Sequence, residues 1–288
     1  MASGLYSRHL NNRKLYYGRQ IALSLILVLF AVISLFPIVY MVAWSFGPNI
    51  EAASSSYSIF PKIWTLDSYK AFVDFNQYSW RWIINSLVVA VFTVAGNVVF
   101  AGLAGYAFAK INFKGRNVLF FMVLVAMMIP YQVTQVPLYI LFAAKFKMTN
   151  TYMALIMPGL CTSYNIFLAK QFFAGIPTAL IESAKIEGCG QLRTYISIIL
   201  PLSKTIFAVM AINTFLSSWN NFFWPFLVTS MDKMYTIQVG LKTFKFANGT
   251  LLSPMMAGAC ISAVPMFILF FSLQKYFLEG VTVGAVKG

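Results

Sequence analysis

The sequence predicts an all-α membrane protein with six transmembrane helices. Of its 288 residues, 60% are hydrophobic and only 10% are charged, whereas soluble domains carry about 25% charged residues. The apolar residues form six stretches free of ionised side chains, each long enough for the roughly 20 residues that cross a bilayer. These stretches are residues 21–46, 83–109, 117–141, 151–169, 205–230 and 254–274.

The stretches are expected to be helices, because a backbone in lipid must satisfy its own hydrogen bonds. The alternating polarity of a membrane β-barrel is missing from the sequence. Segment 205–230 is the least regular, since several Asn and Ser residues interrupt it. The first stretch runs for about 26 residues, too long for the 7–15 residue core of a signal peptide, so it is interpreted as a retained helix.

The distribution of basic residues predicts the orientation. Six spans put both termini on one side, and that side holds 13 of the 21 Lys and Arg residues. Basic residues concentrate in cytoplasmic loops, so both termini are expected in the cytoplasm. The expected parts are a cytoplasmic arm (1–20), a transmembrane domain (21–278) that includes a cytoplasmic loop (170–204), and a cytoplasmic tail (279–288).

Several classes of protein are disfavoured by what the spans lack. No Asp or Glu lies in a span. Ion-coupled secondary carriers usually need an ionisable side chain within the membrane, so this class, the main alternative function for the chain, is disfavoured. No Gly-Lys dipeptide occurs, so a phosphate-binding loop is excluded and any ATP must be hydrolysed elsewhere. One histidine, His9, and three cysteines, Cys161, Cys189 and Cys260, supply neither a metal site nor a catalytic triad. A membrane-embedded enzyme is therefore also disfavoured.

The cytoplasmic loop 170–204 is long and patterned. Pro177 is suited to the start of a helix, and Leu180, Ile181 and Ala184 form an apolar stripe after it. Gly188 is a natural stop for this helix because it tolerates positive φ, and a second short helix follows. An apolar stripe in a cytoplasmic loop needs cover, either from lipid headgroups or from a cleft in a partner protein.

This loop carries a motif that resembles the coupling loop of ABC importer permeases. That motif reads EAA, three residues, G, nine residues, I, one residue, LP. It is matched here by Glu182, Ser183, Ala184, Gly188, Ile198, Leu200 and Pro201. Ser183 replaces the usual alanine, and Glu187 stands where many members have Asp; both are conservative departures. Residues 85–87, 219–225 and 276–288 are similar to carbohydrate-uptake permeases of the maltose type, so the resemblance covers roughly 66–288.

The resemblance implies a permease of the bacterial cytoplasmic (inner) membrane that is not itself an enzyme and binds no cofactor. Its partners would be a second, different permease subunit, two cytoplasmic ATPase subunits that bind ATP and Mg²⁺, an extracytoplasmic solute-binding protein, a sugar and membrane lipid, with no nucleic acid. The implied ATPase-coupling residues are Glu182, Ser183, Ala184, Glu187, Gly188, Leu200 and Pro201. In this scheme Glu182 offers charge to the cleft rim, Ala184 enters the cleft, and the tail residues Lys287 and Gly288 reach the ATPase dimer.

The substrate path is expected on spans three to five, where amides and aromatic rings suit the hydroxyl edges and apolar faces of sugars. The candidates are Gln132, Gln135, Tyr164, Asn165, Asn213, Ser217, Trp219, Asn220, Asn221 and Trp224. The alternative is that they join helices or lie in interfacial aromatic belts. The small residues in 101–109 also allow two interpretations. They permit close packing of helices within the chain, or they form an interface with another subunit.

The substrate is expected to be an oligosaccharide. The outer loops carry eight basic and four acidic residues, against the usual orientation bias. Three interpretations remain: solvated loops of a basic chain, docking of an acidic binding protein, or attraction of an acidic oligosaccharide through residues such as Lys242 and Lys245.

The predicted topology can be tested with reporter fusions. A reporter at Gly190 should be active in the cytoplasm, and one at Gly249 should be active outside it, because five spans precede the second site. Activity on the opposite sides would contradict both the orientation and the assignment of the coupling loop.

Overall fold

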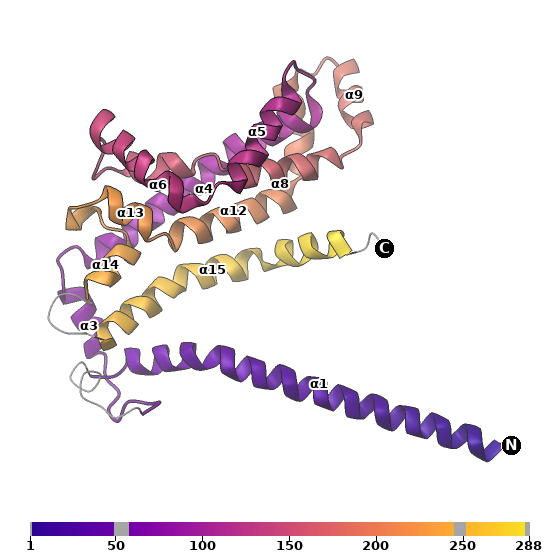
Figure 1. The fold of residues 1–288 in the computed structure, drawn as a ribbon, viewed down its shortest axis with the longest axis vertical. Coiled ribbons are helices and arrows are strands. Elements are labelled where there is room, and N and C mark those ends of the chain that lie inside the picture. Colours follow the sequence, from indigo (N-terminus) through magenta and orange to yellow (C-terminus); the bar gives the residue numbers. More distant parts are fainter. Residues whose placement is uncertain (1, 49–57, 245–251, 286–288) are drawn as a thin grey trace. The chain divides into compact units, whose positions relative to one another are not determined.

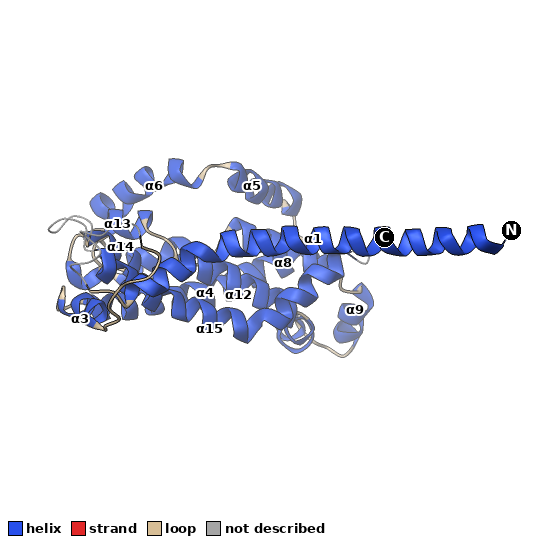
Figure 2. Cartoon of the chain, turned by 90° about the horizontal axis from the view of Figure 1, so that it is seen from below, coloured by secondary structure: helices blue, strands red, loops and turns tan. Residues whose placement is uncertain are grey.

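The computed structural model describes residues 2–48, 58–244 and 252–285, with side chains described for 16–48, 58–244 and 252–275. Every regular element in these ranges is a helix (Figure 2). The chain divides into two compact units, residues 1–72 with 250–260 and residues 73–249 with 261–288. The predicted all-α fold is confirmed, and each unit is considered separately below.

The first unit is built on the long helix α1 (Ala2–Ser45), drawn in indigo in Figure 1. Its apolar side chains are exposed along most of the span, as expected for a surface that faces lipid. The chain turns after Trp44, whose indole N–H donates to the carbonyl of Ser58 at 3.0 Å. The ring of Tyr69, on α3 (Asp67–Asp74), packs 5.2 Å from the ring of Phe46. The Trp44 hydrogen bond and this aromatic contact therefore fix the end of α1 at Ser45.

The second unit is organised around α4 (Ser79–Lys110), with α8 (Ser163–Ala174) and α12 (Lys204–Trp219) beside it (Figures 1 and 2). Two glycines permit the close approach. A methyl group at Gly105 would lie 2.5 Å from Cβ of Ala169, and one at Gly102 would lie 2.7 Å from the Tyr195 hydroxyl. Gly102 and Gly105 thus serve packing within the chain, which favours the first of the two interpretations of this segment.

The third predicted span differs from a single helix. It consists of α5 (Arg116–Met128), α6 (Tyr131–Ile140) and the π-helical turn η1 (Leu141–Lys145), with a bend of 100° between α5 and the rest. Pro130 explains the break, because proline disfavours a helical conformation of the residue before it. That residue, Ile129, is extended with ψ of 122°.

The fourth and fifth spans are composite as well. The fourth contains α7 (Tyr152–Ile156), η2 (Met157–Gly159) and α8. The fifth is α12, which follows α10 (Gln191–Thr194), η3 (Tyr195–Ile199) and α11 (Leu200–Leu202) after a bend of 83°. Among the described residues four helices are long and apolar enough to cross a bilayer, or six if each bent pair is one span. This agrees with the six predicted spans.

The last elements are α13 (Phe223–Val228), η4 (Asp232–Met234), α14 (Ile237–Thr243) and α15 (Leu252–Ala285). The start of α4 holds the segment between α13 and α15 in place. Asn85 Nδ2 donates to the carbonyls of Lys233 and Tyr235, and Ser86 Oγ accepts from the Ile237 N–H at 2.8 Å. The polar pair Asn85-Ser86 therefore has a structural role.

The close contact of α4 with α8 predicts the effect of a single methyl group. Gly105→Ala should lower the thermal stability of the purified protein, because overpacking a tight contact costs about 1–3 kcal/mol. Gly18→Ala is the matched control, since Gly18 has nothing within 4 Å of the position that a methyl group would take. Equal melting temperatures of the two variants would contradict the packing described here.

Candidate functional site: a cavity among the helices and the loop 170–204

A cavity of about 450 Å³ lies in the second unit, among α4, α8, α12 and the segments next to them. Its size is that of a small-molecule site. The wall offers amides, hydroxyls and aromatic rings, and no charged side chain is found among the described residues that form it. These residues are Thr93, Tyr131, Leu155, Pro158, Gly159, Thr162, Tyr164, Asn165, Asn213, Thr214, Ser217, Ser218, Asn221 and Trp224.

The cavity brings together six of the ten residues predicted for the substrate path. They are Tyr164, Asn165, Asn213, Ser217, Asn221 and Trp224. Trp224 is held by a hydrogen bond from its indole N–H to the Ala154 carbonyl at 2.8 Å and by an edge contact with Phe142. Asn221 Nδ2 donates to the Tyr131 hydroxyl at 3.2 Å. The wall is therefore held in shape by its own hydrogen bonds.

The other four predicted residues do not line this cavity. Gln132 and Asn220 are exposed elsewhere. Gln135 is buried, and its Nε2 donates to the Tyr131 carbonyl within the same helix. Trp219 is also buried; its indole N–H donates to the Ser262 carbonyl at 3.0 Å, and its ring stacks on Phe215. For Trp219 the structure supports the alternative, a role in joining helices, whereas the hydrogen bond of Gln135 stays within α6.

Sequence reasoning missed five polar residues of the wall: Thr93, Tyr131, Thr162, Thr214 and Ser218. Thr93 lies on the second span, whereas the substrate path was expected on spans three to five. The available signal was Asn97, one helical turn further along α4, because an amide in an apolar span needs partners.

The second candidate site is the loop that follows α8. Helix α9 (Thr178–Ile186) begins after Pro177 and ends before Gly188, as predicted. Gly188 has φ of 79°, a left-handed conformation that favours glycine. The N–H of the next residue, Cys189, donates to the Ala184 carbonyl at 2.8 Å and closes the helix. The sequence signals for both helix ends are confirmed.

The two faces of α9 have different environments. Ile181 and Ala184 are each 3% exposed, because they face the interior of the chain. Ala184 therefore does not present its side chain to a partner, contrary to the prediction that it enters a cleft. The outward face carries Glu182, Ser183 and Glu187, together with Leu180 and Ile186, which is 87% exposed.

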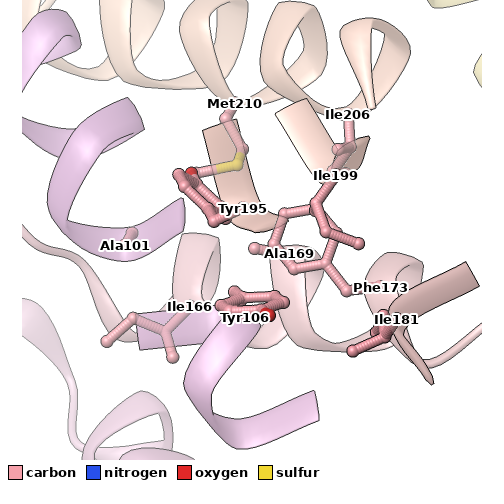
Figure 3. Packing of buried hydrophobic residues seen from close by; sticks show 10 residues of the cluster. All are labelled: Ala101, Tyr106, Ile166, Ala169, Phe173, Ile181, Tyr195, Ile199, Ile206 and Met210. Atoms are coloured by element: carbon pink, nitrogen blue, oxygen red, sulfur yellow. The ribbon is translucent and has the colours of Figure 1, made fainter. Parts of the chain in front are cut away.

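The inward face joins the coupling loop to the membrane helices. Ile181 belongs to a buried cluster with Tyr106 of α4, Phe173 of α8, and Tyr195 and Ile199 of η3 (Figure 3). The Tyr106 hydroxyl and Oε1 of Gln191 are 2.9 Å apart in a hydrogen bond. The Lys110 Nζ donates to the Ile176 carbonyl at 2.6 Å. The loop is thus fixed to α4 and α8 by packing and hydrogen bonds.

Of the remaining predicted residues, Leu200 and Pro201 lie in α11, just before the bend of 83°. Lys287 and Gly288 lie outside the described residues, as does Lys245. Lys242 is exposed, with Nζ 4.3 Å from the ring centroid of Phe222, a distance typical of a cation–π contact.

Comparisons with known proteins agree with this arrangement. Residues 97–283 match the family described as the binding-protein-dependent transport system inner membrane component. The chain is 36% identical over 261 residues to the arabinooligosaccharides transport system permease protein AraQ of Halalkalibacterium halodurans, covering 90% of this chain and 93% of that protein. It is 35% identical over 280 residues to the galactooligosaccharides transport system permease protein GanQ of Bacillus subtilis, covering 94% and 97%.

Among solved structures, a chain of a bacterial ABC transporter involved in the import of the acidic polysaccharide alginate is similar in fold. The TM-score is 0.78 at 22% identity, over 90% of this chain and 96% of that one. A fold of long apolar helices, together with this family match, defines a transport permease. The chain belongs to the family of binding-protein-dependent transport system inner membrane components.

Proposed function

We propose that this chain is a permease subunit that carries an oligosaccharide across the cytoplasmic membrane, along a path that includes the cavity. The observation that carries the proposal is the composition of the cavity wall, in which amides and hydroxyls alternate with the aromatic rings of Tyr131, Tyr164 and Trp224. Such walls suit sugars, which have hydroxyl edges and apolar faces. Relatives named for arabinooligosaccharides and galactooligosaccharides support the same substrate class.

The proposed assembly pairs this chain with a second, different permease subunit. A solute-binding protein delivers the sugar from outside, and two cytoplasmic ATPase subunits bind ATP and Mg²⁺, so this chain needs no cofactor of its own. The family description supports the binding protein. The excess of Lys and Arg on one side of the spans supports cytoplasmic termini, with an arm at 1–20, a tail at 279–288 and the tail residues Lys287 and Gly288 directed to the ATPase.

The outward face of α9 is the proposed docking surface for the ATPase. It combines two carboxylates, Glu182 and Glu187, with two exposed aliphatic side chains, Leu180 and Ile186. An isoleucine that is 87% exposed in a cytoplasmic loop gains stability only when a partner covers it. Ile186 therefore takes the anchoring role that the sequence had suggested for Ala184, while Gly188 sets the turn that presents it.

Ile186→Ser should weaken binding of the ATPase by at least about tenfold, since full burial of an isoleucine side chain contributes about 1.5–3 kcal/mol. The measurement is the affinity of the purified ATPase for the permease pair in nanodiscs, together with ATP-driven uptake. Ile63→Ser is the control, because Ile63 is also an exposed isoleucine, at 61%, but lies in the segment expected outside the cell. Normal ATPase binding by the Ile186 variant would refute the docking surface.

A further inference from the structure

A chain of buried polar side chains joins α4, α8 and α12 at the cavity. Asn97 of α4 donates from Nδ2 to the Gly159 carbonyl at 2.7 Å. Asn165 of α8 donates from Nδ2 to Oδ1 of Asn97 and to Oγ1 of Thr214 on α12, each at 2.8 Å. Asn97 and Asn165 are 0% and 2% exposed. Amides this deeply buried are held in place by such bonds.

The network fixes which way each amide faces. A backbone carbonyl only accepts hydrogen bonds, so Asn97 must turn its nitrogen to Gly159 and its oxygen to α8. Asn165 must then offer its nitrogen to that oxygen, and its two N–H groups are both used by Asn97 and Thr214. The amide oxygen of Asn165 is consequently left as an acceptor without a partner in the described part of the chain.

A second polar atom of the wall, Oγ1 of Thr93, also lacks a hydrogen-bond partner among the described residues. Thr93 lies one helical turn before Asn97 on α4, and its Oγ1 is buried. Its methyl group faces Gly159 so closely that an added Cβ there would lie 2.5 Å away. Thr93 and Asn165 both belong to the cavity wall. A buried polar atom without a hydrogen-bond partner costs about 1–3 kcal/mol of stability. A ligand that forms the missing bond recovers this free energy.

We propose that Asn165 Oδ1 and Thr93 Oγ1 form a subsite that binds a hydroxyl group of a neutral sugar, with Asn97 as the positioning residue. The proposal rests on the proposed function of the cavity as the sugar path. A hydroxyl donates to Asn165 Oδ1, whereas an ionised carboxylate only accepts and is repelled by it. Both atoms are buried in the wall, so the sugar reaches them through a small displacement of the side chains that cover them.

The subsite bears on the three interpretations of the basic outer loops, because it disfavours attraction of an acidic oligosaccharide. Lys242 is held over an aromatic ring outside the cavity wall, while the two acceptors of the subsite lie buried within that wall. A uronic acid ring also offers hydroxyls, but its ionised carboxylate cannot replace a hydroxyl at Asn165 Oδ1. The subsite therefore favours a neutral ring over one that turns its carboxylate toward Asn165, whatever the charge outside.

The test uses the complete importer in proteoliposomes with saturating binding protein, and compares neutral arabinotriose and galactotriose with acidic digalacturonate. Thr93→Val keeps the shape of the side chain and removes its hydroxyl. Import of the neutral sugars should fall about two- to tenfold, the value of one lost hydrogen bond, with no loss of thermal stability. Thr134→Val is the control, because the Thr134 hydroxyl bonds within its own helix outside the cavity wall.

A second variant tests the positioning role. Asn97→Leu frees the Asn165 amide to rotate and present its N–H groups, so the ratio of digalacturonate to arabinotriose import should rise. A merely structural defect would lower both equally. Unchanged neutral import by Thr93→Val, or an equal loss of both sugars in Asn97→Leu, overturns the subsite while the proposed function stands. If the wild-type importer carries digalacturonate but neither neutral sugar, the subsite is overturned and the proposed function stands. If it carries no oligosaccharide with any cognate binding protein, the proposed function fails and the subsite fails with it.

Discussion

The close contact of α4 with α8 and α12 is the constraint on which the rest of the structure depends. Polar groups inside a bilayer have no water to bind, so Asn97 and Asn165 are tolerated only if their helices approach closely enough to hydrogen-bond. Gly105 allows that approach to α8. Small side chains and buried amides therefore act together, the first permitting the contact and the second fixing its register.

This contact links the two candidate sites. Asn97 and Tyr106 are nine residues apart on α4, about 13 Å along the helix axis. Asn97 orients the cavity wall through Asn165, and Tyr106 bonds Gln191 next to the coupling loop. Because the buried cluster of Figure 3 also packs Ile181 of α9 against these helices, we expect a displacement of α9 to carry the wall of the cavity with it. Coupling in this account is the movement of one packed body.

Much of this arrangement could be predicted from the sequence, and the failures have physical causes. The spans follow from composition, and the ends of α9 follow from Pro177 and Gly188, because local backbone chemistry decides both. The 100° bend at Pro130 could not be predicted, since proline kinks vary with tertiary contacts. The inward orientation of Ala184 depends on what packs beneath α9, and the place of Thr93 in the wall depends on which helices α4 meets. Neither is encoded in local pattern.

The claim that the coupling loop and cavity wall move as one body is tested most directly by a distance between spin labels. The labels replace Arg193 of α10 and Phe223 of α13, both exposed, in a chain whose three cysteines are changed to serine. Pulsed electron resonance on the complete importer in nanodiscs, with and without ATP, compares the two states. The account predicts the same distance distribution in both. A shift of several ångströms on ATP binding would show that the loop moves independently of the cavity and would contradict it.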